Sequence, residues 1–435
     1  MSTHLSRPSY AAVLRVPYAR RAFTAALAAR LSYGTVAPAL LLSVSRATGS
    51  WPVSGTVLSL FGATTVFLMP LRASLIDRHG PRRGLLPMSA LYGALLSVLT
   101  ALTWRPGAPA ALVAVSAALA GACAPPLGPA MRALWSELVA DPGLLQRAYS
   151  LDGVAEELLY VSGPALVGVL AGVAPPAAGI LLSAVLNVAG TWAFVATSPA
   201  VPGPRPVSGG RRRPAGVRGL PAPVAVAVAV ALGVGLSLSC AELLVMAFAT
   251  ERSHDPALVP WVLGALSAGS ALGGLANGAV RWRTAARVRL CRFAAALGAV
   301  LALAGLAPDL WTLTAVMALA GAFIAPALTT AYLLADETAA PGSRARAGAW
   351  VNTGVNAGGS AGSLAAGLLI GRFPLSLCFT LAGAAALVTA AAGVVRPRAA
   401  GGLPPAAGGG RPAAQFPATR GDRGRAARAL SPGGA

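Results

Sequence analysis

Apolar runs of about twenty residues recur along most of the chain and leave few folds open to it. At a helical rise of about 1.5 Å per residue, each run can cross a hydrocarbon layer roughly 30 Å thick. The composition agrees, because only 11% of the residues are charged and the mean hydropathy is +0.68. We predict an all-α membrane protein with twelve transmembrane helices, at residues 23–45, 53–74, 85–104, 110–134, 154–174, 177–197, 223–249, 259–280, 290–307, 311–334, 347–371 and 374–395.

A segment rich in proline, glycine and arginine separates the first six spans from the last six. Because such a segment does not pack as a helix, it predicts a linker between two bundles. The predicted domains are a cytoplasmic N-terminal segment, a six-helix bundle, the linker, a second six-helix bundle and a disordered basic tail, at 1–22, 23–197, 198–222, 223–395 and 396–435. We expect the arginines of the tail to bind anionic lipid headgroups rather than nucleic acid.

The distribution of arginine predicts the orientation, because loops rich in arginine stay on the cytoplasmic side. With the N-terminus inside, most arginines fall on the inner side, and the outer connections hold only Arg46, Arg105, Arg252 and Arg372. Both termini are then cytoplasmic, as an even number of spans requires. All 34 basic residues are arginine, which together with abundant alanine, glycine and proline indicates GC-rich coding and a bacterial cell membrane.

The residue inventory excludes several kinds of enzyme. Without lysine the chain has neither a GxxxxGK[ST] phosphate-binding loop nor a Schiff-base lysine, so ATP hydrolysis is excluded. The three histidines are scattered over a tail and two loops, and the four cysteines lie singly in apolar runs. We expect no catalytic residues, no cofactor and no metal site, and a membrane-embedded enzyme would lack a suitable constellation.

The two halves look like diverged copies of one unit. With a shift of 200 residues, Asp77 falls on Asn277 and Pro126 falls on Pro326. Matches at nearly one offset on both sides of the linker predict two bundles of common architecture.

The densest charge cluster is the stretch LIDRHGPRRG, at 75–84, between two apolar runs. It resembles the signature between the second and third helices of the major facilitator superfamily, roughly G-x-L-x-D-R-x-G-R-R, through Ala73, Leu75, Asp77, Arg78, Gly80, Arg82 and Arg83. Ala73 replaces the first glycine, and Pro81 stands where a basic residue is frequent. Two six-span halves joined by a basic linker are similar to the same superfamily. The resemblance implies a secondary transporter whose two bundles rock about a central cavity.

This cluster predicts a latch on the cytoplasmic side. Asp77, at a helix end, can accept hydrogen bonds from arginines or face the positive N-terminus of a helix in the other half. Gly80 and Pro81 give the tight turn that keeps Arg82 and Arg83 in place. The alternative is a positive-inside loop with an incidental acid, but Asp77 has no use in setting topology.

The fifth predicted span contains a second point of resemblance. Gly163, Pro164 and Gly168 in VSGPALVGVLAG are similar to the Gly-Pro motif that efflux-type antiporters of the superfamily carry there, which implies a drug-efflux-like bacterial branch. Small residues let helices approach closely. The eleventh span, which lies at the seam between the halves in the superfamily, contains Gly354, Gly358 and Gly362. These glycines suit a sliding contact between the halves, and plain helix packing explains them equally well.

Ionisable residues inside apolar spans are costly, and each is a candidate coupling site. Arg30 is predicted roughly 10 Å into the first span, where it either snorkels to the inner interface or pairs with an acid. Glu156 and Glu157 begin the fifth span, where they either offset the helix dipole or turn one carboxylate inward. The preferred pair is Arg30 with Glu157, whose repeat equivalent is Asn356.

Glu242 lies within the seventh span with no neighbouring base in sequence. It is either a proton-exchanging acid or an acid at the interface. Arg132 is expected at the cytoplasmic end of the fourth span. The arginine that many proton antiporters of the superfamily carry early in that span is absent, so proton coupling depends on Glu242 and Glu157.

These features predict a transporter and not an enzyme. We expect export of a small hydrophobic or amphipathic molecule by alternating access, in exchange for protons. The alternatives are a uniporter, a sugar or metabolite exporter without proton coupling, and a non-transporting receptor or scaffold with the same fold. The expected partners are a small-molecule substrate, protons and membrane lipids, and the chain is expected to be a monomer.

Overall fold

The computed structural model describes residues 9–197, 220–255, 258–340 and 342–395, which all belong to one compact unit, Met1–Arg396. Most of the predicted linker and the predicted tail lie outside the described residues. The described chain folds into helices: α1 Tyr10–Arg15, α2 Ala19–Thr48, α3 Trp51–Phe67, α4 Met69–His79, α5 Pro81–Thr103, α6 Ala110–Cys123, α7 Leu127–Leu138, α8 Pro142–Ala171, α9 Ala177–Thr197, α10 Ala222–Glu251, α11 Val259–Ala279, α12 Ala286–Ala304, α13 Leu310–Thr338, α14 Arg344–Leu369 and α15 Leu375–Val395.

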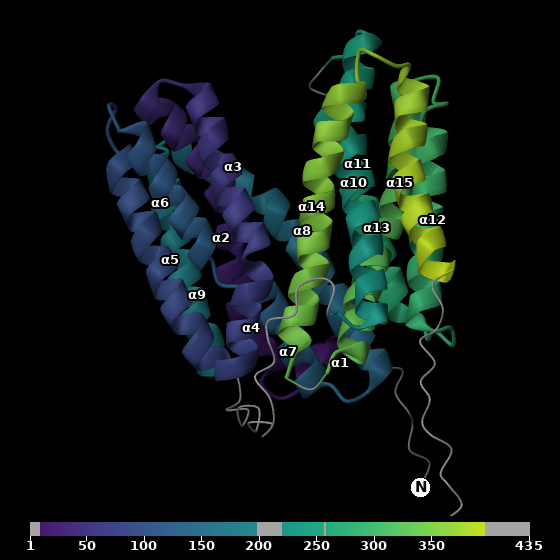
Figure 1. The fold of residues 1–435 in the computed structure, drawn as a ribbon, viewed down its shortest axis with the longest axis horizontal. Coiled ribbons are helices and arrows are strands. Elements are labelled where there is room, and N and C mark those ends of the chain that lie inside the picture. The colour runs from purple at the N-terminus through teal and green to yellow at the C-terminus, as the bar shows by residue number, and fades with distance from the viewer. Residues whose placement is uncertain (1–8, 198–219, 256–257, 341, 396–435) are drawn as a thin grey trace, which may run out of the picture. The chain divides into compact units, whose positions relative to one another are not determined.

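Helices α2 to α9 and α10 to α15 form two groups with equivalent internal pairings, which can be followed by colour in Figure 1. In the first group α2 packs against α8 and α9, and in the second α10 packs against α14 and α15. The pairs α3–α6 and α5–α9 likewise correspond to α11–α13 and α12–α15. The pairing pattern is the one that a repeated unit produces.

Each of the twelve predicted spans falls on a helix or, in two cases, on a pair of helices separated by a break. Among the described residues, nine helices are long and apolar enough to cross a membrane, or ten if the bent pair α3–α4 is one span. In that count Ala110–Leu138, which includes α6 and α7, is a single span. Helix α12 falls outside it because Arg287, Arg289 and Arg292 lie within its 19 residues. Helix α14 is less apolar because it is rich in glycine, serine and asparagine.

Prolines break two of the predicted spans. Helices α3 and α4 meet at a bend of 41°. Pro70 has no N–H to offer to the carbonyl of Val66, four residues earlier. The Val66 carbonyl instead accepts a hydrogen bond from Thr353 Oγ1 of α14, at 3.1 Å. The bend in one half is therefore tied to a helix of the other half.

The second break separates α6 from α7 at Pro125 and Pro126. Because Pro125 lacks an N–H, the carbonyl of Gly121 has no donor four residues later and accepts only a long backbone hydrogen bond from Ala124 N, at 3.4 Å. The buried Arg72 of α4 compensates, since its guanidinium donates to Gly121 O at 3.0 Å and also to Ala124 O. It donates in addition to a carbonyl near the end of α3. One buried cation thus joins both breaks.

The start of α8 corrects a predicted boundary. The helix begins at Pro142 rather than at 154, because the Asp141 side chain caps it by accepting from Leu144 N at 2.7 Å. A proline directly after a capping residue is a favoured helix start. Asp152 therefore lies inside the helix, and α7 likewise extends beyond 134 to Leu138.

The glycines of α14 pack helices within one half and not across the seam. A Cβ added to Gly354, Gly358 or Gly362 would lie within 3 Å of the α10 backbone of the same half. The predicted sliding seam at these glycines is therefore wrong. Their small size allows α14 to pack closely on α10.

The Gly-Pro motif of α8 also acts within one half. A Cβ on Gly163 would lie 2.3 Å from the backbone carbonyl carbon of Gly34, on α2. Pro164 lies inside α8 without ending it. Gly168 has open space around it. Of the three motif residues, Gly163 makes the close contact.

Replacing Gly163 by alanine should lower the thermal stability, because the new methyl group would overlap the α2 backbone, and overpacking costs about 1–3 kcal/mol. The matched Gly168→Ala variant should melt at the parent temperature or slightly above it, since alanine favours a helix by about 0.5–1 kcal/mol over glycine. Thermal melting of the purified variants in detergent measures both. Equal melting temperatures for the two variants would contradict the packing described.

Candidate functional site

Four charged side chains, three of them buried and one partly buried, meet inside the N-terminal half. Arg30 Nη1 of α2 lies 2.6 Å from Asp152 Oδ1, and Arg30 Nη2 lies 2.8 Å from Glu156 Oε2. Arg132 Nε of α7 lies 3.2 Å from Asp152 Oδ2, and its guanidinium also contacts Glu156. The side chains of Arg30 and Asp152 are 1% and 0% exposed. We call Arg30, Arg132, Asp152 and Glu156 the charge quartet.

Helix spacing and the break between α6 and α7 bring the four residues of the quartet together. Asp152 and Glu156 are four positions apart on α8 and therefore share one face. The break between α6 and α7 turns the chain so that Arg132 comes to lie against that face. Two cations and two anions give the quartet no net charge, and each acid contacts both arginines. Such close pairing is required to offset the cost of removing charges from water.

The quartet corrects the predicted partner of Arg30. Arg30 pairs with Asp152 and Glu156, not with Glu157. Arg132, expected at the end of the fourth span, also belongs to the quartet, and α7 continues beyond it to Leu138. The sequence signal that could have found the site is the acid pair four residues apart in SLDGVAEE, which marks one helix face.

A chain of contacts connects the quartet with the C-terminal half. The guanidinium carbon of Arg132 lies 3.7 Å from the centre of the Tyr332 ring, on α13, which is cation–π geometry. The Tyr332 hydroxyl accepts a hydrogen bond from Asn352 of α14 at 3.3 Å. Asn356, one turn further along, donates to Asn352 O at 2.8 Å. The predicted cavity residue Asn356 thus reaches the quartet through two intermediates.

Glu157 lies at the contact between the halves. Its carboxylate accepts a hydrogen bond from Ser270 Oγ of α11. Within the part of the chain that the structure describes, Glu157 has no basic partner. Of the two adjacent acids, Glu156 belongs to the quartet, whereas Glu157 is half-buried beside the C-terminal half.

Glu242 is exposed on α10. Ser239 and Gly235, three and seven positions earlier, face α14, since a Cβ on Gly359 would lie 3.0 Å from Ser239 Oγ. Helical spacing places Glu242 on the same face. In the described residues it forms no ion pair or hydrogen bond. The structure therefore leaves Glu242 apart from both Arg30 and the charge quartet.

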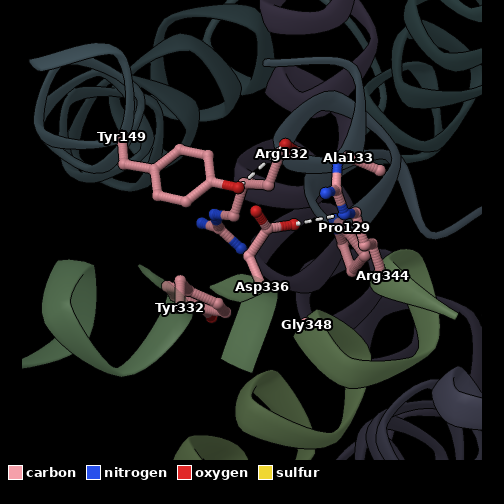
Figure 2. Close-up of a pocket in the computed structure, with 8 residues that line it drawn as sticks. All are labelled: Pro129, Arg132, Ala133, Tyr149, Tyr332, Asp336, Arg344 and Gly348. Carbon is pink, nitrogen blue, oxygen red and sulfur yellow. Dashed lines mark hydrogen bonds and ion pairs between the residues drawn. The ribbon is translucent and has the colours of Figure 1, made fainter. Parts of the chain in front are cut away.

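A small pocket lies between α7 and α8 on one side and α13 and α14 on the other (Figure 2). Its volume is about 220 Å³ including its opening, and it is lined by Pro129, Arg132, Ala133, Tyr149, Tyr332, Asp336, Arg344 and Gly348. Arg344 Nε lies 3.6 Å from Asp336 Oδ1, and Tyr149 donates to Arg132 O at 3.0 Å. Drug-sized ligands need about 300–1,000 Å³, so this pocket is too small for such a cargo.

The Asp77 carboxylate contacts the N-terminus of a helix in the other half. It accepts from Arg346 N at 2.9 Å and from Ala345 N at 3.3 Å, at the start of α14. Ser343, the capping residue of α14, makes no side-chain cap of its own. Asp77 therefore caps α14 from the opposite half, which is one of the two arrangements that the sequence predicts.

The remaining residues of the predicted latch shape the turn. Gly80 has φ 82°, a backbone conformation that favours glycine, and Pro81 is the first residue of α5. Arg78, Arg82 and Arg83 are exposed, and none forms an ion pair with any described residue. The arginines therefore do not bind Asp77.

A second contact between the halves was not predicted. Gln146 of α8 donates to Asn277 O at 2.5 Å, and Arg147 donates to Ala279 O at 3.1 Å, so both bind the end of α11. Arg289 Nη1 of α12 donates to Gln146 Oε1 at 2.7 Å. The repeat that aligns Asp77 with Asn277 is a sequence signal for a contact at the end of α11. The hydrogen bonds themselves could not be predicted, because their acceptors are backbone carbonyls.

All hydrogen bonds between the halves, among the described residues, occur from the helix midpoints to the end that carries Asp77. The halves are therefore joined at that end. No group of three or more metal-ligating side chains lies together in the described ranges.

The sequence matches the model of the Major Facilitator Superfamily over residues 22–301. The fold is similar to that of the human organic anion transporter MFSD10 (TETRAN), with 17% identity and a TM-score of 0.66 over 88% of this chain and 99% of that one. A bacterial homologue of the iron transporter ferroportin is 14% identical, with a TM-score of 0.68 over 86% of this chain and 98% of that one. The E. coli fucose:proton symporter is 13% identical, with a TM-score of 0.60 over 85% of this chain and 98% of that one. No curated protein matches the sequence.

Replacing Asp152 by asparagine should strongly destabilise the protein, because it leaves two buried guanidinium groups against one carboxylate. Breaking a buried pair in this way costs about 3–5 kcal/mol. The double variant Arg30→Gln with Asp152→Asn restores neutrality and should recover part of the loss. Melting temperatures of the three proteins in detergent test this, and a single variant as stable as the parent would rule out the quartet as drawn.

Replacing Asp77 by alanine should loosen the joined end. A lost helix cap is worth about 1 kcal/mol, which corresponds to roughly fivefold more opening. The readout is labelling of a cysteine introduced at the buried Ala349, in a cysteine-free background, by a membrane-impermeant maleimide in inside-out vesicles.

The matched control for that experiment is Asp309→Ala. Asp309 caps α13 within its own half, where the hydrogen bonds from the backbone of Thr312 lower the pKa of its carboxyl group. This variant should lose similar stability without faster labelling at position 349. Faster labelling in both variants would show general loosening instead of a latch.

Proposed function

The chain belongs to the major facilitator superfamily and is a multi-pass membrane transporter, and from this premise we propose that it exports a small hydrophobic or amphipathic molecule in exchange for protons. The superfamily consists of secondary transporters and not enzymes, so no chemistry on the cargo is required. The proposal concerns the class of cargo, the direction and the coupling ion.

The observation that carries the proposal is the placement of Glu157. The arginines of the quartet are fully matched by Asp152 and Glu156. Glu157 is left as a half-buried acid without a basic partner among the described residues. Acids placed in this way within a membrane typically mark proton relays or ion pathways. Glu157 is therefore our candidate for the group that exchanges a proton.

The contact of Glu157 with Ser270 supplies a link between protonation and conformation. The hydrogen bond joins α8 of one half to α11 of the other. Moving the halves apart would break it, and the carboxylate would then lose its only described donor. Whatever favours the separated state must also change the proton affinity of Glu157, because the coupling between two sites is reciprocal.

The cargo class follows from the character of the spans. Alanine, valine, leucine and glycine dominate them, and the hydrophobic fraction of the chain is 56%. Sites for small molecules in such surroundings are mostly apolar with a few polar groups that fix orientation. Glu242 and Asn356, both exposed on neighbouring helices of the C-terminal half, are candidates for those polar groups.

We place the end that carries Asp77 on the cytoplasmic side, because Arg78, Arg82 and Arg83 are exposed there and arginine-rich loops remain inside. In this orientation the halves, residues 23–197 and 223–395, are joined on the cytoplasmic side. We propose a bacterial cell membrane as the location and a monomer as the working unit.

Replacing Glu157 by glutamine should reduce proton-gradient-driven uptake of a fluorescent amphiphile into proteoliposomes by about tenfold or more, the range of ordinary coupling energies. Exchange of amphiphile across the membrane without a gradient should persist, because the cargo pathway is intact. Glu251→Gln, at the exposed end of α10, is the matched control and should behave like the parent.

The same assay separates the rival functions. A uniporter would show parental flux that does not respond to the gradient, and a sugar or metabolite exporter would show flux only with polar cargo. If Glu157→Gln transports against the gradient as well as the parent does, Glu157 does not couple protons.

A further inference from the structure

Arg72 occupies an unusual position for a buried charge. No carboxylate within the described ranges pairs with it, and its side chain is surrounded by carbonyl oxygens. Two of them, Gly121 O and Ala124 O, belong to the end of α6, and Thr65 O belongs to the end of α3. Helix C-termini carry partial negative charge, so two of them can compensate one guanidinium.

The two helix pieces beyond these breaks carry gate contacts to the other half. Helix α4 carries Asp77, which caps α14. Helix α7 carries Arg132, which lies over Tyr332, and Ser136, which accepts a hydrogen bond from Arg344. Helices α4, α7 and α14 also share a small cluster of apolar residues formed by Ala73, Ala345 and Ala349, with Met69 and Ala133 beside it.

The repeat shows that the arrangement belongs to one half only. Shifting by 200 residues places Pro126 on Pro326, but Pro125 on Ala325 and Arg72 on Leu272. Helix α13 stays continuous through Pro326, and Leu272 is exposed. The second proline and the buried arginine therefore occur together with the helix break and are absent together where the helix is intact.

We propose that Arg72 is a positioning residue that pins a hinge, about which α4 and α7 bend as a gate relative to the rest of the N-terminal half. The guanidinium keeps donating hydrogen bonds to the carbonyls at both breaks while the helix ends change direction. Pro125 cannot take over this function because it has no backbone N–H. The closed end then opens partly by bending within one half and not only by rocking of two rigid bundles. This goes beyond the proposed function, since it holds for any cargo or coupling ion.

The test measures a distance inside the N-terminal half, which rigid rocking leaves unchanged. Spin labels at Ala140, just after α7, and at Ala196, near the end of α9, are introduced into a cysteine-free full-length chain in lipid nanodiscs. Both positions are exposed. The parent should give a broad or two-peaked distance distribution. A single narrow distribution in the parent would overturn the proposal.

The decisive variant copies the continuous helix of the other half. Arg72→Leu alone should be unstable, because it removes the guanidinium donor from the carbonyls at both breaks. Adding Pro125→Ala restores an N–H four residues after Gly121, so the double variant should regain stability. It should also narrow the distribution between positions 140 and 196 and reduce transport at least severalfold. A double variant that is stable but keeps the parental distribution would show that Arg72 is only a structural contact.

Two further measurements test the hinge without the double variant. Arg72→Lys keeps the charge but reaches fewer carbonyls and should shift the distribution partway, while the exposed Arg105→Met should leave it unchanged. Hydrogen–deuterium exchange on the unmodified protein should show α4 and α7 exchanging together and faster than α3 and α6. Equal protection across both breaks would overturn the hinge. Because the distance distributions and the hydrogen–deuterium exchange use no cargo, they test the hinge even if the transport proposal fails.

Discussion

Hydrocarbon offers neither counter-charges nor hydrogen bonds, so a charged group or a freed backbone carbonyl within the spans is costly unless it finds a partner inside the protein. This constraint explains where the charged residues lie. Arg30 and Arg132 share two carboxylates, and Arg72 is compensated by the ends of two helices. The carbonyl of Val66, deprived of a helical partner by Pro70, is satisfied by Thr353 from the other half. At each of the two breaks, a polar side chain donates to a carbonyl that the proline leaves without its helical partner.

The same constraint separates structural charges from those available for coupling. Asp152 and Glu156 each contact two arginines, so a change in either would leave an unbalanced buried charge. Glu157 has a hydroxyl donor in the other half instead of a base. It can gain or lose charge without breaking an ion pair. Adjacent residues on one helix thus have different uses, because they point toward different neighbours.

The sequence predicts the fold well, because long apolar runs and arginine-rich loops reflect the membrane directly. The family model and the similar solved structures confirm the superfamily fold. Local pairings were harder to predict. The Arg30–Glu157 pair is wrong because α8 begins at Pro142, which brings Asp152 into the helix and gives Arg30 a different partner. The role of Arg72 could not be predicted, because its partners are backbone carbonyls that no residue type marks.

Two of the contacts that join the halves have the same architecture with reversed polarity. In one, the side chain of Asp77 accepts from backbone N–H groups at the start of α14. In the other, the side chains of Gln146 and Arg147 donate to backbone carbonyls at the end of α11. Both therefore use a helix end of the C-terminal half, where unpaired backbone groups are available.

This difference in polarity has a consequence for opening. A carboxylate can be neutralised by a proton, whereas glutamine is neutral and arginine keeps its charge in proteins. Protonation can therefore weaken the Asp77 contact but has no direct effect on the contact of Gln146 and Arg147. Because both contacts lie at the joined end, its closure combines a pH-sensitive interaction with a pH-insensitive one. A proton on Asp77 weakens only the first of these contacts, whereas the second is broken only when α8 moves relative to α11.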